Sequence, residues 1–247
     1  VLLYPGGQLG DERQINQAVL EGSIQIGVGA GAMANLAPVY NVVQLPFLIR
    51  GQKHMTAIAE GPVGEKLAQR IEQQAGLKTL AWFSTGDSAI ETVKKQVTTP
   101  ADLAGVKLRV IEAPVLVEAM RAIGASPTPM AYLEVYTGMK QGIIDGARFD
   151  VLSVDVLKVG EVIKYMTDWE QATFLSEPRP VIMSAKFFAG LSPERQKLIR
   201  DAMLEAAVLE RKVFLEKMAT IRVKLLADGV KINKIDVPAF VAVVQPV

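Results

Sequence analysis

Apolar residues along the chain switch between strand spacing and helix spacing. Residues 24–29 alternate apolar with small or polar side chains, which predicts a strand, and residues 11–21 carry Ile15, Ala18 and Val19 at helical spacing. The same pattern predicts further strands at 1–4, 42–47, 79–83, 106–110, 181–183 and 230–232, and further helices at 64–74, 114–123, 133–141, 156–162 and 192–226. Strands and helices therefore interleave, which is typical of an α/β fold with open, largely parallel sheets.

Cap and turn residues separate these segments. Thr99, with the acid Asp102 three residues later, predicts a short helix that Gly105 ends. Prolines keep residues 125–130 extended. Residues 29–34 have little side-chain bulk, and they predict a loop that allows close approach by backbone or ligand.

The longest helical pattern begins at Ser192 and continues to Leu226. It places Leu198, Leu209 and Val213 on one face, which is the expected buried face. A helix of this length is expected to brace more than one lobe. The 247 residues suit one large domain or two lobes of about 100–150 residues each.

Charge and composition argue against several classes of partner. Lys plus Arg (27) nearly cancel Asp plus Glu (26), and the densest basic run, Lys94-Lys95, has only two residues. Nucleic acid or an anionic membrane is therefore not expected as the main partner. The chain has no cysteine and a single histidine, His54, which we expect to be exposed on a helix. We therefore expect no cofactor, no metal site and no catalytic residue.

Membrane and export signals are also missing from this sequence. Its apolar runs fall short of the roughly 18 residues that span a bilayer, so we expect a protein that is not embedded in a membrane. Residues 1–5 lack the basic start and apolar stretch of a signal peptide and resemble a strand inside a fold. We therefore expect a mature or trimmed piece of a longer protein.

Arg109 is the first candidate for binding chemistry. It lies on the strand predicted at 106–110, and its planar guanidinium can hold a carboxylate through two parallel hydrogen bonds. From the pattern alone, a surface ion pair is the more frequent arrangement. The same holds for Glu112 and Asp145, which can be ligand contacts or structural carboxylates, and for Tyr132 and Phe149, which can line a cleft or pack in a core.

A set of motifs in fixed order gives this chain a family resemblance. It resembles the solute-binding proteins of tripartite ATP-independent periplasmic (TRAP) transporters, the DctP type, over nearly its whole length. The motifs are Tyr-Pro-Gly-Gly-Gln-Leu-Gly-Asp-Glu-Arg at 4–13, Leu-Pro-Phe-Leu at 45–48, Pro-Ala-Asp-Leu-Ala-Gly-Val-Lys-Leu-Arg at 100–109, Gly-Ala-Ser-Pro-Thr-Pro-Met at 124–130, Glu-Val-Tyr at 134–136 and Gln-Gly-Ile-Ile-Asp-Gly at 141–146.

The resemblance implies a fold and a function. It implies a two-lobed periplasmic-binding-protein fold, similar to type II, with a ligand cleft between lobes that close by a hinge. Lobe I is expected to comprise residues 1–86 plus about 175–214, without the family's N-terminal strand and helix, and lobe II residues 87–174 plus about 215–247. It also implies a periplasmic receptor that delivers a small organic acid to a TRAP membrane permease.

The resemblance also implies which residues bind the ligand. Arg109 stands where the family's arginine grips the ligand carboxylate, Tyr132 where an aromatic contacts the ligand, and Phe149 where an asparagine often does. Glu112 falls near another polar contact, and Ala30 lies in the first-lobe loop that faces the solute.

Two departures from the family pattern bear on the ligand. A Gly-x-Arg segment of the family reads Gly-Asp-Ser at 86–88, so Ser88 replaces an arginine, and Asp-Gly-Gln-Glu-Asn reads Asp-Gly-Ala-Arg-Phe at 145–149. The loss of one cation and one amide favours a monocarboxylate with a less polar body over a sialic acid or a C4-dicarboxylate. Arg148 supplies the missing charge if its side chain turns inward.

Two alternatives from other functional classes remain open. One is an α/β enzyme that holds a carboxylate substrate with Arg109 and uses Glu112 or Asp145 as acid or base. The other is the ligand-sensing domain of a signalling protein with the same fold.

Overall fold

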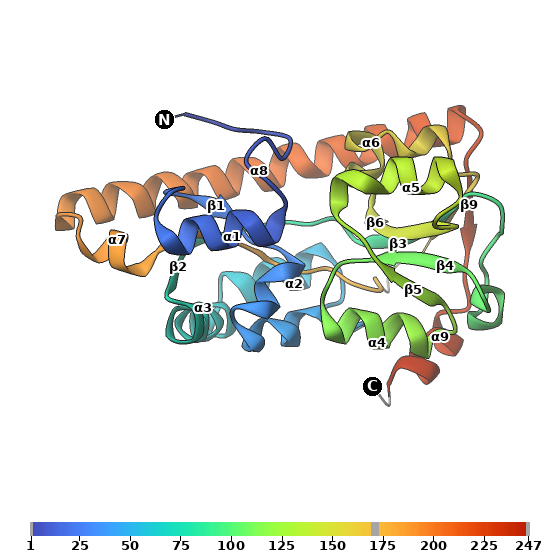
Figure 1. The fold of residues 1–247 in the computed structure, drawn as a ribbon, viewed down its shortest axis with the longest axis horizontal. Helices are drawn as coiled ribbons and strands as arrows, with labels where there is room; N and C mark the ends of the chain where they lie inside the picture. The colour runs from blue at the N-terminus through green and yellow to red at the C-terminus, as the bar shows by residue number, and fades with distance from the viewer. Residues whose placement is uncertain (1, 169–172, 246–247) are drawn as a thin grey trace.

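The structure is a computed structural model that describes residues 2–168 and 173–245. Its strands form two separate sheets, each with its own helices, and the long helix α8 (Pro193–Ala227) runs beside both (Figure 1). We call the part around the smaller sheet the first lobe and the part around the larger sheet the second lobe.

The first lobe is built on a three-stranded sheet with the order β1 (Gly27–Val28), β8 (Arg179–Ser184) and β2 (Leu77–Phe83). Both strand pairs are antiparallel. The helices of this lobe are α1 (Glu12–Glu21), α2 (Gln52–Ala59), α3 (Pro62–Ala75) and α7 (Ala185–Ala189), with the 3-10 helices η1 (Gly31–Asn35) and η2 (Pro38–Gln44). Its core contains Val19, Met33, Tyr40, Ile71, Leu77 and Ile182.

The second lobe is built on a six-stranded mixed sheet. Its order is β5 (Ser126–Pro129), β4 (Lys107–Val110), β6 (Gly146–Asp150), β3 (Ser88–Thr92), β7 (Tyr165–Asp168) and β9 (Lys231–Lys234). β4 is parallel to β5 and β6, and β7 to β9, whereas β3 is antiparallel to both of its neighbours. The helices are α4 (Pro114–Ala122), α5 (Val135–Gln141), α6 (Val151–Val156) and α9 (Val237–Val244), with η3 (Pro100–Leu103), η4 (Tyr132–Glu134) and η5 (Val159–Glu161).

The α/β class is confirmed, but the prediction of largely parallel sheets is wrong for the first lobe. Its short strands come from distant parts of the chain and pair in opposite directions. The alternation of helices and strands along the sequence does not determine whether paired strands are parallel. β8 joins the first sheet after the chain has passed through the second lobe, and it pairs antiparallel with both neighbours.

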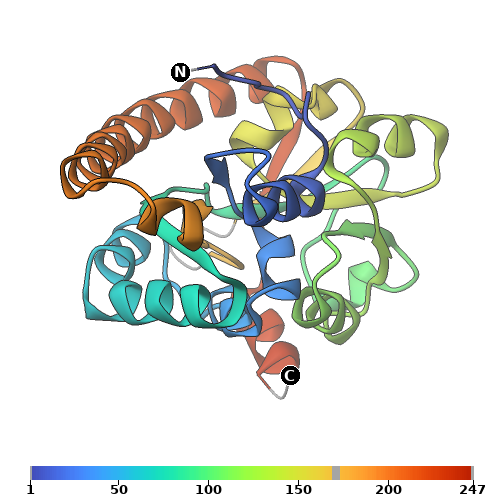
Figure 2. The same ribbon diagram turned by 60° about the vertical axis from the view of Figure 1, so that its left-hand side comes forward.

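The chain passes between the lobes through residues 84–87, residues 173–178 and α8. The first two segments lie side by side: the Ser88 N–H donates to the Leu175 carbonyl at 3.0 Å, and the Thr85 hydroxyl donates to the Glu177 carbonyl at 2.8 Å. Figure 2 shows α8 running over the top of both lobes. Connections of this kind are typical of two-lobed proteins that close by a hinge.

The predicted long helix is confirmed, but its predicted buried face is wrong. Leu198 and Leu209 are 68% and 61% exposed, whereas the buried side carries Ala207, Phe214 and Ile221 at seven-residue spacing. Apolar residues occur on several sides of α8, so their spacing alone does not identify the side that faces the lobes.

Several local predictions hold because a cap or turn residue defines them. Asp11 forms a capping box with Gln14 at the start of α1, and Thr99 forms one with Asp102 at the start of η3. His54 lies in α2 as expected, but it is half-buried, and its Nδ1 accepts the Arg50 backbone N–H at 3.1 Å.

Other local predictions are wrong where apolar runs are short. Residues 42–47 are not a strand, because Pro38 starts the 3-10 helix η2, which ends at Gln44. Residues 29–34 are not wholly a loop, because η1 occupies Gly31–Asn35. Short apolar runs do not distinguish a strand from a buried helical turn.

The strand predicted at 1–4 is wrong for residues 2–4, which are exposed and belong to no strand, and Val1 lies outside the described residues. The helix predicted at 156–162 is formed only in part, as the 3-10 helix η5 at Val159–Glu161. The α-helix α6 lies earlier, at Val151–Val156, because the Asp150 carboxylate accepts the Ser153 N–H and starts it there. Lys158 then adopts a positive φ of 55°.

Candidate functional site

A small cavity lies where the ends of β4, β6 and β8 meet the start of α1. Its volume is about 30 Å³, room for about one water molecule. Both lobes contribute its lining, which combines three arginines and three acids with aromatic, hydroxyl and small residues. The lining residues are Arg109, Arg148, Arg179, Glu12, Asp150, Glu177, Thr85, Gly86, Ser88, Ile111, Tyr132, Phe149, Ser153 and Leu175.

Arg109 is held rigidly at the end of β4. It is only 4% exposed, its Nε donates to the Met130 carbonyl at 3.0 Å, and its Cζ lies 5.4 Å from the centre of the Phe149 ring. Burial lowers the pKa of Arg109 to about 10, so the guanidinium keeps its charge at neutral pH. A cation fixed by one carbonyl and one ring face is preorganised to hold an anion with its remaining N–H groups.

Two aromatic rings form an apolar wall beside Arg109. Tyr132 and Phe149 meet edge to face, with ring centres 5.9 Å apart and an interplanar angle of 90°. Burial raises the pKa of Tyr132, although a hydrogen bond with the Ser153 side chain opposes this shift. The phenol therefore stays protonated at neutral pH and remains a hydrogen-bond donor.

The two other arginines lie among the acids. Burial lowers the pKa of Arg148, with Glu177 opposing this effect. Burial also acts to lower the pKa of Arg179, but Glu12, Glu177 and Asp150 together raise it. The Nε of Arg179 is enclosed and has no hydrogen-bond partner among the described residues. Arg179 therefore keeps unused hydrogen-bonding capacity at the cavity.

The acids differ in how they are held. Burial raises the pKa of Glu177, whereas Arg179 and Arg148 lower it. Glu177 also accepts a hydrogen bond from the Gln44 amide at 3.3 Å. Asp150 accepts the Ser153 N–H at 3.0 Å and the Ser153 hydroxyl at 2.7 Å, so it caps α6 at the same time as it lines the cavity. The cavity thus presents fixed donors and acceptors side by side.

Five of the seven residues expected in the ligand site lie together at this cavity. They are Arg109, Tyr132, Phe149, Ser88 and Arg148. Ser88 uses its hydroxyl as a donor to the Leu175 carbonyl at 3.1 Å, so it also ties the two crossing segments together.

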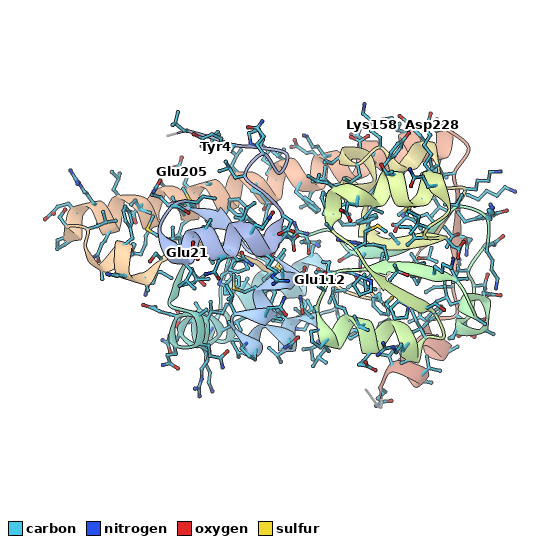
Figure 3. The ribbon with its side chains drawn as sticks, viewed as in Figure 1. Tyr4, Glu21, Glu112, Lys158, Glu205 and Asp228 are labelled. Atoms are coloured by element: carbon cyan, nitrogen blue, oxygen red, sulfur yellow. The ribbon has the colours of Figure 1, made fainter. Side chains whose placement is uncertain are left out.

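Glu112 and Ala30 do not line the cavity. The Glu112 side chain is 60% exposed, and its Oε2 lies 3.7 Å from the Arg13 guanidinium. Figure 3 labels Glu112 near the middle of the molecule, and it borders an open groove of about 1060 Å³ between α1 and α4. Ala30 is buried as the N-cap of η1, one residue before Gly31, which packs against Ile111 of the second lobe.

The sequence did not reveal four charged residues of the cavity lining. Glu12, Asp150, Glu177 and Arg179 are all brought to the cavity by the fold. Arg179 stands between two prolines just before a predicted buried strand, which was the one signal that a charge enters the interior there. Arg148 lies in the lining, as required if it is to replace the missing charge, and Arg179 adds a third cation that was not expected.

The described part of the chain has neither a cluster of metal-binding side chains nor a helix that could span a membrane. Residues 2–168 and 173–245 contain no group of three or more His, Cys, Asp or Glu side chains arranged to hold a metal ion. Within the same ranges, no helix is both long and apolar enough to cross a membrane.

Known proteins are similar to this chain in sequence and in fold. Residues 1–247 match the family described as bacterial extracellular solute-binding protein, family 7. The chain is 33% identical over 240 residues to the 2,3-diketo-L-gulonate-binding periplasmic protein of Escherichia coli, spanning 96% of this chain and 72% of that protein.

Solved structures agree closely with this fold. A TRAP periplasmic solute-binding protein from a Sulfitobacter species, with bound β-D-galacturonate, superposes with a TM-score of 0.92 at 32% identity and covers 97% of this chain and 79% of its own. A TRAP periplasmic solute-binding protein from Roseobacter denitrificans, with bound β-D-glucuronate, superposes with a TM-score of 0.94 at 30% identity. The match covers 99% of this chain and 80% of that protein's chain. This chain therefore belongs to the family 7 extracellular solute-binding proteins, the TRAP solute receptors of the DctP type, and is a two-lobed receptor, not an enzyme.

Proposed function

We propose that this protein is the receptor for a sugar acid with a single carboxylate, with hexuronates as the first candidates. The charge balance of the cavity carries this proposal. The lining has three arginines and three acids, so it is balanced when every acid is ionised. Burial raises the pKa of Glu177, and any protonation of this acid leaves an excess of positive charge. Such a site suits one negative charge better than two.

The acids that flank the arginines suit hydroxyl groups. A sugar hydroxyl donates one hydrogen bond and accepts others, and adjacent arginine and carboxylate side chains satisfy both directions. Arg109 would hold the carboxylate, while Arg179, Glu12 and Glu177 would pair with hydroxyls. The relatives with bound galacturonate and glucuronate are consistent with such a ligand.

Ligand entry requires the lobes to separate. Sites for small molecules have volumes of about 300–1,000 Å³, whereas this cavity measures about 30 Å³. We infer that residues 84–87 and 173–178 act as the hinge. We also propose that lobe I comprises 1–86 plus about 175–214 and lobe II comprises 87–174 plus about 215–247.

Membership of the family supports a role for this receptor in solute transport. We propose that it works in the periplasm and passes its ligand to a TRAP membrane permease. Closure around the ligand would give the permease a surface that differs from that of the open receptor.

A thermal-shift screen tests the proposal. A ligand that binds only the folded state raises the melting temperature. We expect shifts with D-galacturonate, D-glucuronate and L-galactonate, and none with D-galactose or succinate. A shift with succinate that exceeds every sugar acid would refute the assignment.

A further inference from the structure

A buried acid lies beneath the cavity without lining it. Glu91, on β3, has an exposed fraction of 0%. Its Oε2 accepts the Phe149 backbone N–H at 3.0 Å, while its Oε1 has no hydrogen-bond partner among the described residues. A carboxyl group that is enclosed and half satisfied is destabilising. The ligand chemistry derived above does not use Glu91.

The register of the second sheet places Glu91 on the face that carries Arg109. Ala147 of β6 lies opposite Glu91 of β3 on one side and opposite Arg109 of β4 on the other. Directly opposed residues in a sheet point to the same face, as do residues two apart along a strand. Phe149, two residues after Ala147, shares this face. Glu91 and Arg109 thus flank the small Ala147.

Phe149 connects the buried acid with the arginine. The Phe149 backbone N–H donates a hydrogen bond to Glu91. The Phe149 ring contacts both the Arg109 guanidinium and the Tyr132 ring. A shift of the Phe149 backbone would therefore move the surface on which the guanidinium lies. Small displacements of a binding group are enough to weaken a preorganised site.

We propose that Glu91 is a positioning residue of the solute site, which fixes Phe149 against Arg109. The binding readout of this proposal rests on the sugar-acid function proposed above.

The surroundings of Glu91 favour the neutral form. Burial raises the pKa of Glu91 well above its usual value, and the negative charge of Asp150 raises it further. The hydrogen bond from the Phe149 N–H and the positive charge of Arg148 both act to lower this pKa. On the other neighbouring strand, β7, the residue opposite is Met166, which does not titrate.

Two substitutions separate the hydrogen bond from the charge. Glu91→Gln keeps an acceptor oxygen and is always neutral, whereas Glu91→Leu removes the acceptor at similar volume. By calorimetry with D-galacturonate at pH 7, we expect Glu91→Gln to bind within about twofold of wild type and Glu91→Leu to bind about tenfold more weakly. Thr92→Val is the control, because it removes a buried polar group at the next position of the same strand, on the opposite face.

A second readout needs no ligand. Labelling with 15N-phenylalanine gives a spectrum of eight residues, in which Phe149→Tyr identifies the Phe149 amide. We expect this signal to shift as the pH rises and Glu91 ionises in the wild type, and to stay constant in Glu91→Gln. This readout remains informative even if Glu91→Leu fails to fold.

The affinities and the amide signal test different parts of the proposal. Wild-type affinity in Glu91→Leu would overturn the positioning role, and equal losses in Glu91→Gln and Glu91→Leu would overturn the neutral form. A Phe149 amide signal that stays constant with pH in the wild type, or that shifts equally in the wild type and in Glu91→Gln, would overturn the link between the two residues. A wild-type protein that binds no sugar acid would instead refute the proposed function, and the amide titration would then decide the role of Glu91.

Discussion

At the scale of single residues, the site depends on side chains whose charges are fixed before any ligand arrives. Arg109 is held by the Met130 carbonyl and by the Phe149 ring, so it loses little conformational freedom when it binds an anion. Arg148 and Arg179 are buried near acids whose charges favour the protonated guanidinium: Glu177, Glu91 and Asp150 act on Arg148, and Glu12, Glu177 and Asp150 act on Arg179. This difference supports the proposed division of roles, in which Arg109, beside an aromatic wall, holds the carboxylate and the two arginines among the acids pair with hydroxyls.

Replacement of this arginine should therefore weaken binding strongly. We expect Arg109→Ala to raise the Kd for D-galacturonate at least tenfold, because a hydrogen bond to a charged group contributes about 1.5–3 kcal/mol. Arg121→Ala is the matched control, because Arg121 is exposed on α4 and pairs with Glu118 outside the cavity. Calorimetry measures both variants, and equal affinity in the two would contradict the role of Arg109.

Residue identities alone located only part of this site. Arg109 ends one of the motifs that carry the family resemblance, whereas Tyr132 and Phe149 lie outside the motifs and were assigned by the position that the resemblance gives them. Glu12 lies within a motif but was given no role, and Glu177 and Arg179 reach the cavity only because the chain returns to the first sheet as β8. Glu112 follows Arg109 closely in sequence, yet its side chain faces Arg13, because the chain turns outward before α4.

At the scale of elements, helix starts bring charges to the cavity. The Asp11 capping box fixes the first turn of α1, and Glu12 is the first residue of that helix. Asp150 starts α6 and lines the cavity directly. The starts of α1 and η3, marked by Asp11 and Thr99, were predicted correctly. The cap Asp150 of α6 was not recognised, and η2 was mistaken for a strand because its apolar run is short.

Loss of the α1 cap should loosen one wall of the cavity. We expect Asp11→Ala to destabilise the protein by about 1 kcal/mol, the usual contribution of an N-cap, and to weaken D-galacturonate binding because Glu12 is less well placed. Urea unfolding and calorimetry measure the two effects. Asp236→Ala, which removes the equivalent cap of α9 far from the cavity, should lower stability alone. A parallel loss of binding in Asp236→Ala would contradict this reasoning.

At the scale of the whole molecule, the two lobes meet closely at Gly31. A Cβ at this position would lie 3.0 Å from the Ile111 side chain of the second lobe and 3.0 Å from the Gln44 amide. Contacts this short require the neighbours to move. The absence of a side chain at Gly31 thus allows the lobes to approach.

A larger residue at this position should hold the lobes apart. We expect Gly31→Val to raise the Kd for D-galacturonate about tenfold, mainly through faster dissociation, because the closed form is disfavoured. Stopped-flow measurements give the rates, and small-angle scattering gives the dimensions with ligand present. Unchanged dissociation with unchanged dimensions would contradict the assigned contact.

The buried acids make stability depend on pH for the whole molecule. Burial raises the pKa of Asp87, Glu91 and Glu177 above their ordinary values of 3.8 to 4.5. The folded state therefore binds protons that the unfolded state releases, and stability falls as pH rises above about 4.5. We expect a higher Tm at pH 5 than at pH 8, with a smaller difference in Glu91→Gln. A Tm that rises over this interval would show that other groups dominate.

We propose that the cavity accepts one carboxylate among several hydroxyls. Isothermal titration of the wild-type protein with D-galactose, D-galacturonate and galactarate tests this proposal, because these three molecules share a carbon skeleton and carry zero, one and two carboxylates. We expect D-galacturonate to bind at least tenfold more tightly than either of the others, a difference of about 1.4 kcal/mol. Tighter binding of galactarate or of D-galactose would contradict it.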